Sequence, residues 1–357
     1  MAERGGAIVG TAGAGDDVAI DLAVLAELMR GDGLDVSGDL TGSRVGMGQS
    51  NLTYLVEDAE GARWVARRPP RGHLLQTAHD VHREFGILSA LRDTPVPVPT
   101  IAGEYVDSRL AEATVVVMQY VDGLVVERPE VAESLSTELR SALGPALART
   151  LAGIHQVDLE QVGLAGLGSH APYAARQIKR WSRQWESSRT RDLPALDAIT
   201  ELLARRVPQQ REVTLVHGDF HIRNVIADPA TGDVRAVLDW ELSTLGDPLA
   251  DIGSLLAYWP EAADPPTALF AASTLPGFVD RAALRQAYLA ASGRDGADLD
   301  YWHVLGLWKI AIICEGVLRR ALEDPRNAAA GGPPEPLVID QLVERAWRTA
   351  VEAGLDH

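Results

Sequence analysis

The feature that most constrains the fold is a change of residue pattern along the chain. Residues 40–70 and 100–121 carry strand patterns, whereas the chain after Gly123 is mostly spaced as amphipathic helices. A strand-rich island at residues 213–240 interrupts the helical part. The pattern predicts an α+β fold in which a small β-rich lobe precedes a larger, mostly helical lobe. The crossing is expected near "MQYVDG", Met118–Gly123, and ligand sites favour such crevices.

Helices are expected on both sides of this crossing. The stretch "DDVAIDLAVLAELMRGDG" predicts a first helix, capped by Asp16 or Asp17 at its start and by Gly31 or Gly33 at its end. A second helix is expected in "HDVHREFGILSALRD", with an apolar face of Val81, Phe85, Leu88 and Leu91. Later helices are expected at residues 130–157, 172–190, 194–206, 279–292, 298–323 and 336–353. The expected division is a flexible segment at 1–15, an N-lobe at 16–121 and a C-lobe at 122–357.

Composition excludes several classes of protein. Hydrophobic residues make up 46% of the 357 residues, enough for a sizeable core, and the net charge of −17 argues against nonspecific nucleic-acid binding. The lone cysteine, Cys314, excludes an intrachain disulfide and is expected to be a buried core thiol. No apolar run approaches the roughly 20 residues that span a bilayer, and the N-terminus does not resemble a signal peptide. We therefore expect a cytoplasmic protein without a membrane partner.

The stretch "GSRVGMGQSNLTYLV", residues 42–56, places glycines between two strand patterns. Backbone N–H groups in such a loop can approach phosphate oxygens. Gly46 and Gly48 begin a G-x-G pattern, but Asn51 stands where a third glycine would be, and a strand follows. It is therefore neither a dinucleotide-binding turn nor a Walker A loop. Ser50 and Asn51 could add side-chain donors, and an ordinary hairpin is the alternative interpretation.

The next strand, "RWVARRPP", offers cations beside this loop. Arg67 and Arg68 point to opposite faces of the strand, so one of them can reach a bound phosphate. Glu84 in the following helix is an available ion-pair partner. Solvated surface arginines are the alternative.

The motif with the most specific spacing lies in the strand-rich island. "LVHGDFHIRN" places His217, Asp219 and Asn224 at a strand-to-loop junction, and Asp239 ends the next strand but one. Phosphoryl transfer needs a carboxylate for the acceptor hydroxyl and an oxygen-rich pair for Mg²⁺. Asp219 suits the first task, and Asn224 with Asp239 suits the second. The alternative is an ordinary set of turn residues.

The chain resembles a known family at these residues. H-x-D-x-x-x-x-N followed by "DWE" is similar to the aminoglycoside phosphotransferase family, a branch of the protein-kinase-like two-lobe fold, over roughly residues 40–320. The resemblance implies a kinase that uses ATP and Mg²⁺ to phosphorylate a hydroxyl of a small molecule. It implies phosphate contacts from Gly46, Gly48, Ser50, Asn51 and Arg67, a pairing of Arg67 with Glu84, adenine contacts from Gln119 to Val121, Asp219 as base, and Asn224 and Asp239 as Mg²⁺ ligands. Two departures are the arginine in place of lysine and the missing third glycine.

The acceptor is less defined by the sequence. The segment "APYAARQIKRWSRQWESSR" predicts a helix with a tryptophan face and a basic stripe, which comprises Arg176, Lys179, Arg180 and Arg183. The segments "GQSNLTYLV", "ARRPP" and "RQIKRW" resemble the subfamily associated with acyl-CoA dehydrogenases, which implies a hydroxyacyl-CoA or a related metabolite. The family label favours an aminoglycoside, and hence antibiotic resistance, slightly ahead of that alternative. A nucleotide-binding protein without catalysis is the third interpretation.

Three further polar residues are expected to be structural. His155 lies on an amphipathic helix, and Asp247 in "LGDPLADIG" is placed to cap a helix. The resemblance implies that Asp247 and Asp251 support the catalytic loop, and it gives His217 a bracing role.

Overall fold

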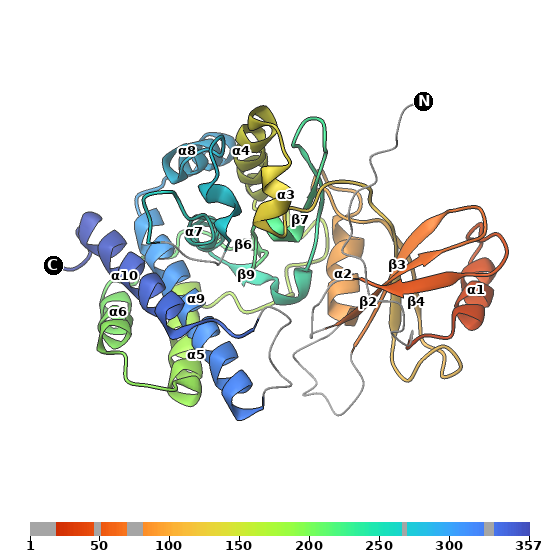
Figure 1. Ribbon diagram of the computed structural model, residues 1–357, viewed down its shortest axis with the longest axis horizontal. Helices are drawn as coiled ribbons and strands as arrows, with labels where there is room; N and C mark the ends of the chain where they lie inside the picture. The colour runs from red at the N-terminus through yellow and green to blue at the C-terminus, as the bar shows by residue number, and fades with distance from the viewer. Residues whose placement is uncertain (1–18, 46–50, 70–80, 266–269, 325–331) are drawn as a thin grey trace. The chain divides into compact units, whose positions relative to one another are not determined.

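A computed structural model describes residues 19–45, 51–69, 81–265, 270–324 and 332–357 (Figure 1). The chain divides into two compact units. The first comprises the chain up to Leu124 together with Arg235–Glu241, and the second comprises Val125–Val234 and Leu242–His357. These units differ from the expected division at residue 122, since residues 122–124 and Arg235–Glu241 fall in the first unit. The segment Arg235–Glu241 joins the first unit because Val237 N–H bonds to Pro97 O at 2.8 Å and Arg235 bonds to Asp122 O at 2.8 Å.

The first unit is built on one antiparallel sheet with strand order β1-β2-β3-β5-β4. Alternate residues of its strands pack against helix α1 in a core that includes Met29, Tyr54, Trp64 and Val117. Helix α2 contacts β4 and β5. The elements are α1 (Leu22–Gly31), β1 (Thr41–Arg44), β2 (Leu52–Glu57), β3 (Arg63–Arg68), α2 (Val81–Leu91), β4 (Ile101–Tyr105) and β5 (Val115–Gln119).

The first helix begins later than the sequence suggested. Asp21 caps it, because its carboxylate accepts the N–H groups of Ala23 and Val24 at 3.0 Å each. Asp16 and Asp17 lie outside the described residues. At the other end, Gly33 has a φ of 82°, the left-handed conformation that terminates helices, so the predicted glycine stop is confirmed.

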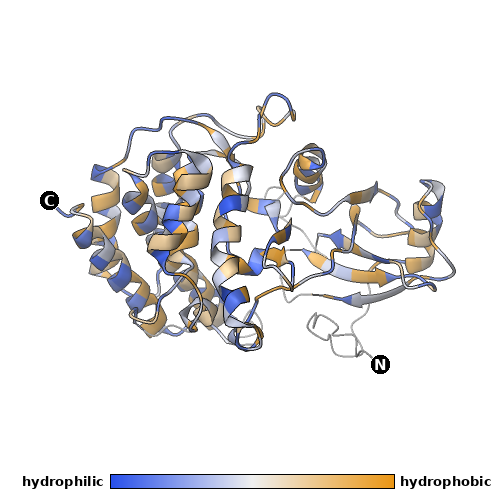
Figure 2. Ribbon diagram, turned by 90° about the horizontal axis from the view of Figure 1, so that it is seen from above, coloured by the Kyte–Doolittle hydropathy of each residue, from blue (hydrophilic) through white to orange (hydrophobic). Residues whose placement is uncertain are grey.

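The second unit is mostly helical, and its surface helices carry both hydrophilic and hydrophobic stretches (Figure 2). Its helices are α3 (Pro129–Glu133), α4 (Thr137–Ile154), α5 (Tyr173–Ser188), α6 (Pro194–Arg205), α7 (Pro248–Ala257), α8 (Arg281–Ser292), α9 (Leu299–Glu323) and α10 (Pro336–Glu352). The segment expected as one helix at 130–157 is two, because Ser136 starts α4 by accepting the N–H of Leu139. Helix α7 was expected only through the N-cap at Asp247, and its extent was not predicted. All ten of its residues are buried, so the sequence shows no amphipathic period there.

The strand-rich island is confirmed as short strands around the central motif. Strand β6 (Thr214–Val216) pairs antiparallel with β9 (Thr244–Gly246). Strands β7 (Val225–Ala227) and β8 (Val234–Val237) lie between them in the chain. The central motif therefore follows directly on β6 and lies in the loop between β6 and β7.

Helix α9 is the central element of the second unit and packs against α5, α7 and α10 (Figure 1). By length and composition it could cross a membrane, but 83% of its most apolar window is buried inside the fold, as in the core helix of a globular domain. It contains Cys314, which is buried as expected, and burial raises the pKa of its thiol to about 12.

Helices α7 and α9 cross at very short range because glycines face each other. A Cβ at Gly253 would lie 2.5 Å from the backbone carbon of Trp302, and a Cβ at Gly306 would lie 3.0 Å from the carbonyl oxygen of Gly253. No other residue type allows this approach without moving a helix backbone.

Gly253→Ala is expected to lower the free energy of unfolding by roughly 1–3 kcal/mol, because the new methyl group forces α7 and α9 apart. Gly153→Ala in α4 is the matched control, since a Cβ there meets nothing within 4 Å. The control should be neutral or stabilising by about 0.5–1 kcal/mol. Denaturant unfolding measures both. Equal stabilities for the two variants would contradict the close crossing.

Asp247 caps α7 by accepting the N–H of Leu249 at 2.9 Å, as expected for a cap. Burial, with the charges of Glu212 and Asp298, raises the pKa of Asp247 to about 6. The folded protein therefore holds a proton that the unfolded chain releases, so this group makes stability fall as pH rises from about 4 to about 6.

Asp247→Asn keeps the cap but cannot ionise. We expect it to raise the free energy of unfolding at pH 7 by about 1–2 kcal/mol and to change it little at pH 4. Thermal unfolding at both pH values measures this. Asp280→Asn, at the exposed cap of α8, is the control and should show no such difference.

Candidate active site

One buried carboxylate, that of Asp251, fixes the backbone of the loop after β6 through hydrogen bonds. Asp251 of α7 accepts the backbone N–H groups of His217 and Gly218 at 2.6 and 2.9 Å. His155, itself bonded to the Tyr288 hydroxyl at 2.8 Å, contacts the same carboxylate at 3.3 Å. Burial lowers the pKa of His155, so the imidazole is neutral near pH 7. The expected supporting role of Asp251 is confirmed, and His155 is structural.

His217 supports the loop from within. Its side chain is fully buried, its ring Nδ1 accepts the N–H of Asp219 at 3.3 Å, and its carbonyl accepts the Ser243 hydroxyl at 3.1 Å. Gly218 has a φ of 84°, and a Cβ there would lie 2.7 Å from the carbonyl oxygen of Leu242. Glycine is therefore required at position 218. The hydrogen bonds of His217 to Asp219 and Ser243 confirm its expected bracing role.

The Asp219 side chain emerges from this turn among polar neighbours. Its Oδ1 accepts the hydroxyl of Tyr258 at 2.9 Å, while Oδ2 has two longer contacts, with the amide nitrogen of Asn224 at 3.4 Å and with His221 Nε2 at 3.5 Å. Burial by itself raises the pKa of Asp219, but the hydrogen bond and charge of His221, the charge of Lys309 and the hydroxyl of Tyr258 hold it below its ordinary value. The carboxylate is therefore an anion at neutral pH, and its more weakly engaged Oδ2 is the atom that can receive a ligand's hydroxyl.

Asn224 returns to the same loop at the end of a short 3₁₀ turn, Ile222–Asn224. Its amide nitrogen donates to the carbonyl of Asp219 at 3.0 Å. This contact orients the amide group through its nitrogen, and no hydrogen bond from a described residue engages its oxygen. The oxygen is thus available as a neutral ligand to a cation.

A buried ion-pair network lies in the first unit. Arg67 donates from Nη1 to Glu84 at 2.7 Å and from Nη2 to Asp239 at 3.0 Å. The pKa of Glu84 is raised mainly by burial, against the opposing charge of Arg67. The predicted pairing of Arg67 with Glu84 is confirmed. Arginine, unlike lysine, can serve two carboxylates from separate nitrogens of one planar group.

Arg68 occupies the opposite face of β3, as strand alternation predicts. It is 2% exposed and donates from Nη1 to the carbonyl of Ala19 at 2.7 Å. The Arg68 side chain is therefore buried on the other face of the sheet from Arg67. This placement supports Arg67 as the cation on the functional face, and its contact with phosphate stays a prediction.

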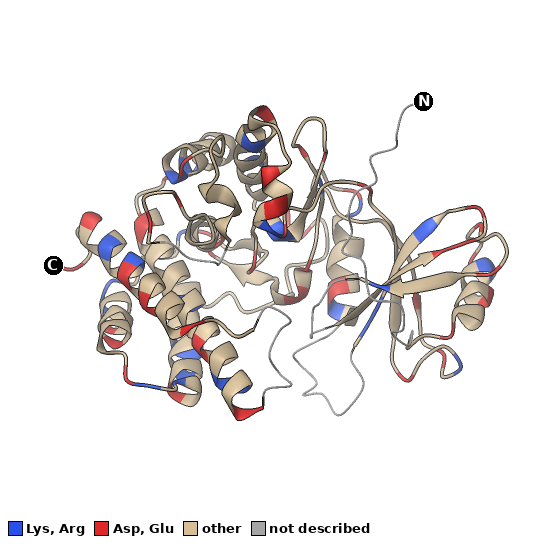
Figure 3. Cartoon of the chain, in the orientation of Figure 1, with Lys and Arg blue, Asp and Glu red and all other residues tan. Residues whose placement is uncertain are grey.

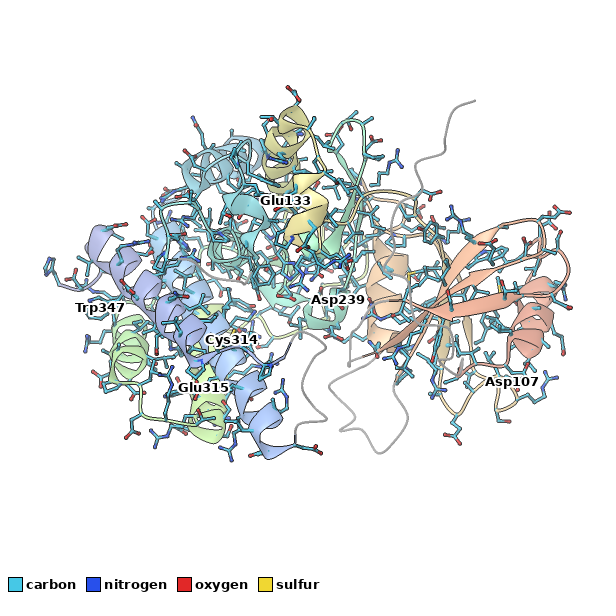
Figure 4. The ribbon with its side chains drawn as sticks, viewed as in Figure 1. Asp107, Glu133, Asp239, Cys314, Glu315 and Trp347 are labelled. Carbon is cyan, nitrogen blue, oxygen red and sulfur yellow. The ribbon has the colours of Figure 1, made fainter. Side chains whose placement is uncertain are left out.

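Asp239, labelled in Figure 4, follows β8 in a left-handed conformation with a φ of 65°. Its side chain is 35% exposed. One of its oxygens bonds to Arg67 and the other can take a cation. Asp239 belongs to the first unit and Asn224 to the second. Carboxylate and amide oxygens are the donors that Mg²⁺ prefers, so each of the two residues, taken by itself, carries a donor that suits the predicted metal.

The other predicted nucleotide residues differ in what the structure says of them. Gly46, Gly48 and Ser50 lie outside the described residues. Asn51 immediately precedes β2 and is buried, and both polar atoms of its side chain have no hydrogen-bond partner within the described part of the chain. Gln119 ends β5, where its N–H bonds to the carbonyl of Thr100 at 2.8 Å, and Val121 follows.

The sequence analysis missed Tyr258 and Lys309, and it gave His221 no role. His221 stands two residues after Asp219, so its proximity could have been noted. Tyr258 and Lys309 lie 39 and 90 residues from Asp219 in the chain, and no local pattern distinguishes them from core residues. Acidic and basic residues are interspersed over the surrounding helices (Figure 3).

Comparison with known proteins gives relatives of two kinds. Mouse (Mus musculus) acyl-CoA dehydrogenase family member 10 is 33% identical over 319 residues, which cover 86% of this chain and 29% of that protein. Human (Homo sapiens) acyl-CoA dehydrogenase family member 11 is 32% identical over 305 residues, 84% of this chain and 39% of that protein. The chain thus spans less than half the length of these relatives. A solved structure from Ralstonia eutropha JMP134, provisionally named an aminoglycoside phosphotransferase, is 28% identical with a TM-score of 0.75, and covers 93% of this chain and 99% of that one.

Residues 41–305 match the phosphotransferase enzyme family. This range includes both the β-rich unit's sheet and the loop that carries Asp219. The expected fold class and the resemblance are therefore confirmed: the chain belongs to the phosphotransferase enzyme family and has its kinase-like fold, with a β-rich N-terminal part and a mostly helical C-terminal part.

Proposed function

We propose that the protein transfers the γ-phosphate of Mg²⁺-bound ATP to a hydroxyl group of a small molecule. The observation that carries this proposal is the geometry of the loop after β6. Asp219 is an anion whose Oδ2 has only long contacts, and Asn224 in the same loop bonds through its amide nitrogen, which leaves its oxygen without a hydrogen bond from the described residues. A loop built only for turns would not need to hold a carboxylate ionised in a partly buried place.

Asp219 acts on the acceptor by orientation. Its Oδ2 accepts the hydrogen bond of the acceptor hydroxyl and aligns the oxygen with the phosphorus. The depressed pKa makes it a weak base, which suits a loose transition state in which the proton leaves late. Tyr258 keeps the carboxylate in one rotamer by occupying Oδ1.

Asn224 and Asp239 would hold the metal, which when bound neutralises charge on the phosphates. Arg67 supports the same phosphates with a charge that Glu84 fixes in direction. Asn51, which precedes β2 and directly follows Ser50 in the sequence, offers a side-chain amide that has no partner among the described residues. These roles rest on the chemistry of the residues and on the family to which the chain belongs.

For the acceptor we favour a hydroxyacyl-CoA or related metabolite over an aminoglycoside. Support comes from the curated relatives, which are named as members of the acyl-CoA dehydrogenase family. The basic stripe of α5 agrees with an anionic ligand: Lys179, Arg180 and Arg183 are exposed. Arg176 differs from them, because it is partly buried and donates to the carbonyl of Leu245 at 2.8 Å. An ATP-consumption screen across hydroxyacyl-CoAs, aminoglycosides and amino alcohols tests this choice.

Asp219→Asn is expected to lower kcat by about 10²–10⁴-fold, since the amide cannot accept the proton or orient the hydroxyl as an anion does. The affinity for Mg²⁺·ATP should stay within about twofold of the wild-type value, which is less than the loss of one hydrogen bond to the nucleotide would cause. Asp239→Asn should weaken metal-dependent nucleotide binding as well as turnover. Steady-state rates and calorimetric titrations measure the two effects. Near-normal turnover by Asp219→Asn would contradict the proposed phosphotransferase activity of this site. If the wild type binds nucleotide but turns over no acceptor, the protein is better described as a non-catalytic nucleotide-binding protein.

Charge reversal on α5 tests the acceptor class. Arg180→Glu with Arg183→Glu should raise KM for a hydroxyacyl-CoA by about tenfold through repulsion, and should leave or lower KM for an aminoglycoside. Arg205→Glu with Arg206→Glu, on the exposed end of α6, changes the net charge equally and is the control. Equal effects of the two double variants would show that the stripe does not select the acceptor.

A further inference from the structure

We infer that Lys309, in the middle of α9, is a positioning residue that fixes the peptide group leading into Asp219. The inference rests on the proposed function, because it assigns the lysine a task in the same reaction. Lys309 lies outside the motifs that the sequence analysis singled out, and 91 residues separate it from the carbonyl group that it binds.

The contacts around Gly218 carry this inference. The Nζ of Lys309 donates to the Gly218 carbonyl oxygen at 2.8 Å, and the lysine is 8% exposed. The same peptide group ends in the N–H of Asp219, which bonds to His217 Nδ1 at 3.3 Å. The peptide plane between Gly218 and Asp219 is therefore held at both ends. The preceding peptide is held by Asp251, which accepts the Gly218 N–H at 2.9 Å.

Holding this plane matters because Gly218 is a flexible turn residue. Glycine can rotate its backbone with little steric cost, and a rotation of the next peptide would swing the Asp219 carboxylate away from the acceptor. A displacement of about 1 Å at a reacting group can cost about 10²-fold in rate. The hydrogen bond from Lys309 thus restricts the backbone at Gly218, where a glycine is required and would otherwise leave the backbone flexible.

The chemistry of the surroundings favours a cation at this position. Asp219 and Asp251 flank the Gly218 turn, and both act electrostatically on Lys309. The ammonium group also lies 5.5 Å from the ring centroid of Trp181 on α5. Burial lowers the pKa of Lys309 and the charge of Arg180 adds to that shift, while the two carboxylates oppose it and the ring stabilises the cation. A neutral side chain would leave two buried carboxylates with less compensation.

The close crossing of α7 and α9 explains how the lysine reaches the loop. Gly306 precedes Lys309 by about one turn of α9, and Gly253 follows Asp251 by two residues on α7. The contact between these glycines brings both helices beneath the same turn. One helix delivers the acceptor for the loop's N–H groups, and the other delivers the donor for its carbonyl.

The test compares Lys309→Met, Lys309→Arg and a control on the same helix. Lys309→Met should lower kcat by about 10–100-fold while the Kd of Mg²⁺·ATP stays within about twofold. Lys309→Arg keeps a charged donor and should restore kcat to within about fivefold of the wild type. The control, Trp308→Phe, removes the bond from Trp308 Nε1 to Thr200 Oγ1 at 2.8 Å, away from the loop. It should lower Tm without lowering kcat.

Three outcomes would overturn the inference. The first is a normal kcat for Lys309→Met, and the second is a loss of kcat that Trp308→Phe reproduces at an equal loss of Tm. The third is a loss that Lys309→Arg does not reverse although it restores Tm to the wild-type value. The last two would assign Lys309 to general stability only.

Hydrogen exchange separates this inference from the proposed function. Lys309→Met should speed amide exchange in peptides that cover residues 214–221, and Trp308→Phe should not. If the wild type phosphorylates nothing in the screen, the proposed function fails, while faster exchange in Lys309→Met still supports the anchoring of the loop. Unchanged exchange in that variant would overturn the role of Lys309 whatever the activity.

Discussion

The acceptance of two successive backbone N–H groups by the Asp251 carboxylate is the interaction on which the site depends. Asp251 is 1% exposed, so its carboxylate oxygens accept hydrogen bonds from the protein and not from water. The N–H groups of His217 and Gly218 compensate the cost of burying its charge. These bonds set the start of the turn from which Asp219 projects. A loop bonded in this way keeps its conformation before any ligand arrives, which is the preorganisation that phosphoryl transfer uses.

In the first unit, a buried carboxylate is compensated by an arginine side chain and not by backbone N–H groups. Glu84 is 4% exposed and would be costly as an isolated charge, and Arg67 compensates it while also reaching Asp239. The forked guanidinium explains why arginine can stand where the family resemblance implies lysine. One planar group orders a helix residue and a residue after β8 together, so the predicted metal ligand belongs to the unit that carries the predicted phosphate cation.

Much of this could be predicted from local pattern. Alternation along "RWVARR" separated Arg67 from Arg68 correctly, because side chains of a strand point to opposite faces. The spacing of His217, Asp219 and Asn224 located the loop, since a short turn brings all three together. Pattern indicated the cap of α7 at Asp247 but not the extent of the helix, because its ten residues are buried on every side and show no period. It also missed the boundary at Arg235–Glu241, whose partners lie more than 110 residues earlier.

The sequence by itself determined the order of elements, the class of fold and the candidate residues for phosphoryl transfer, because these follow from periodicity and spacing within short windows. Only the tertiary structure decided which buried groups support the loop that carries Asp219. Asp251, Tyr258 and Lys309 act on the loop from α7 and α9, and their positions depend on how closely two helices pass at Gly253 and Gly306. Such a distance is set by packing between segments remote in the chain, which no local pattern records.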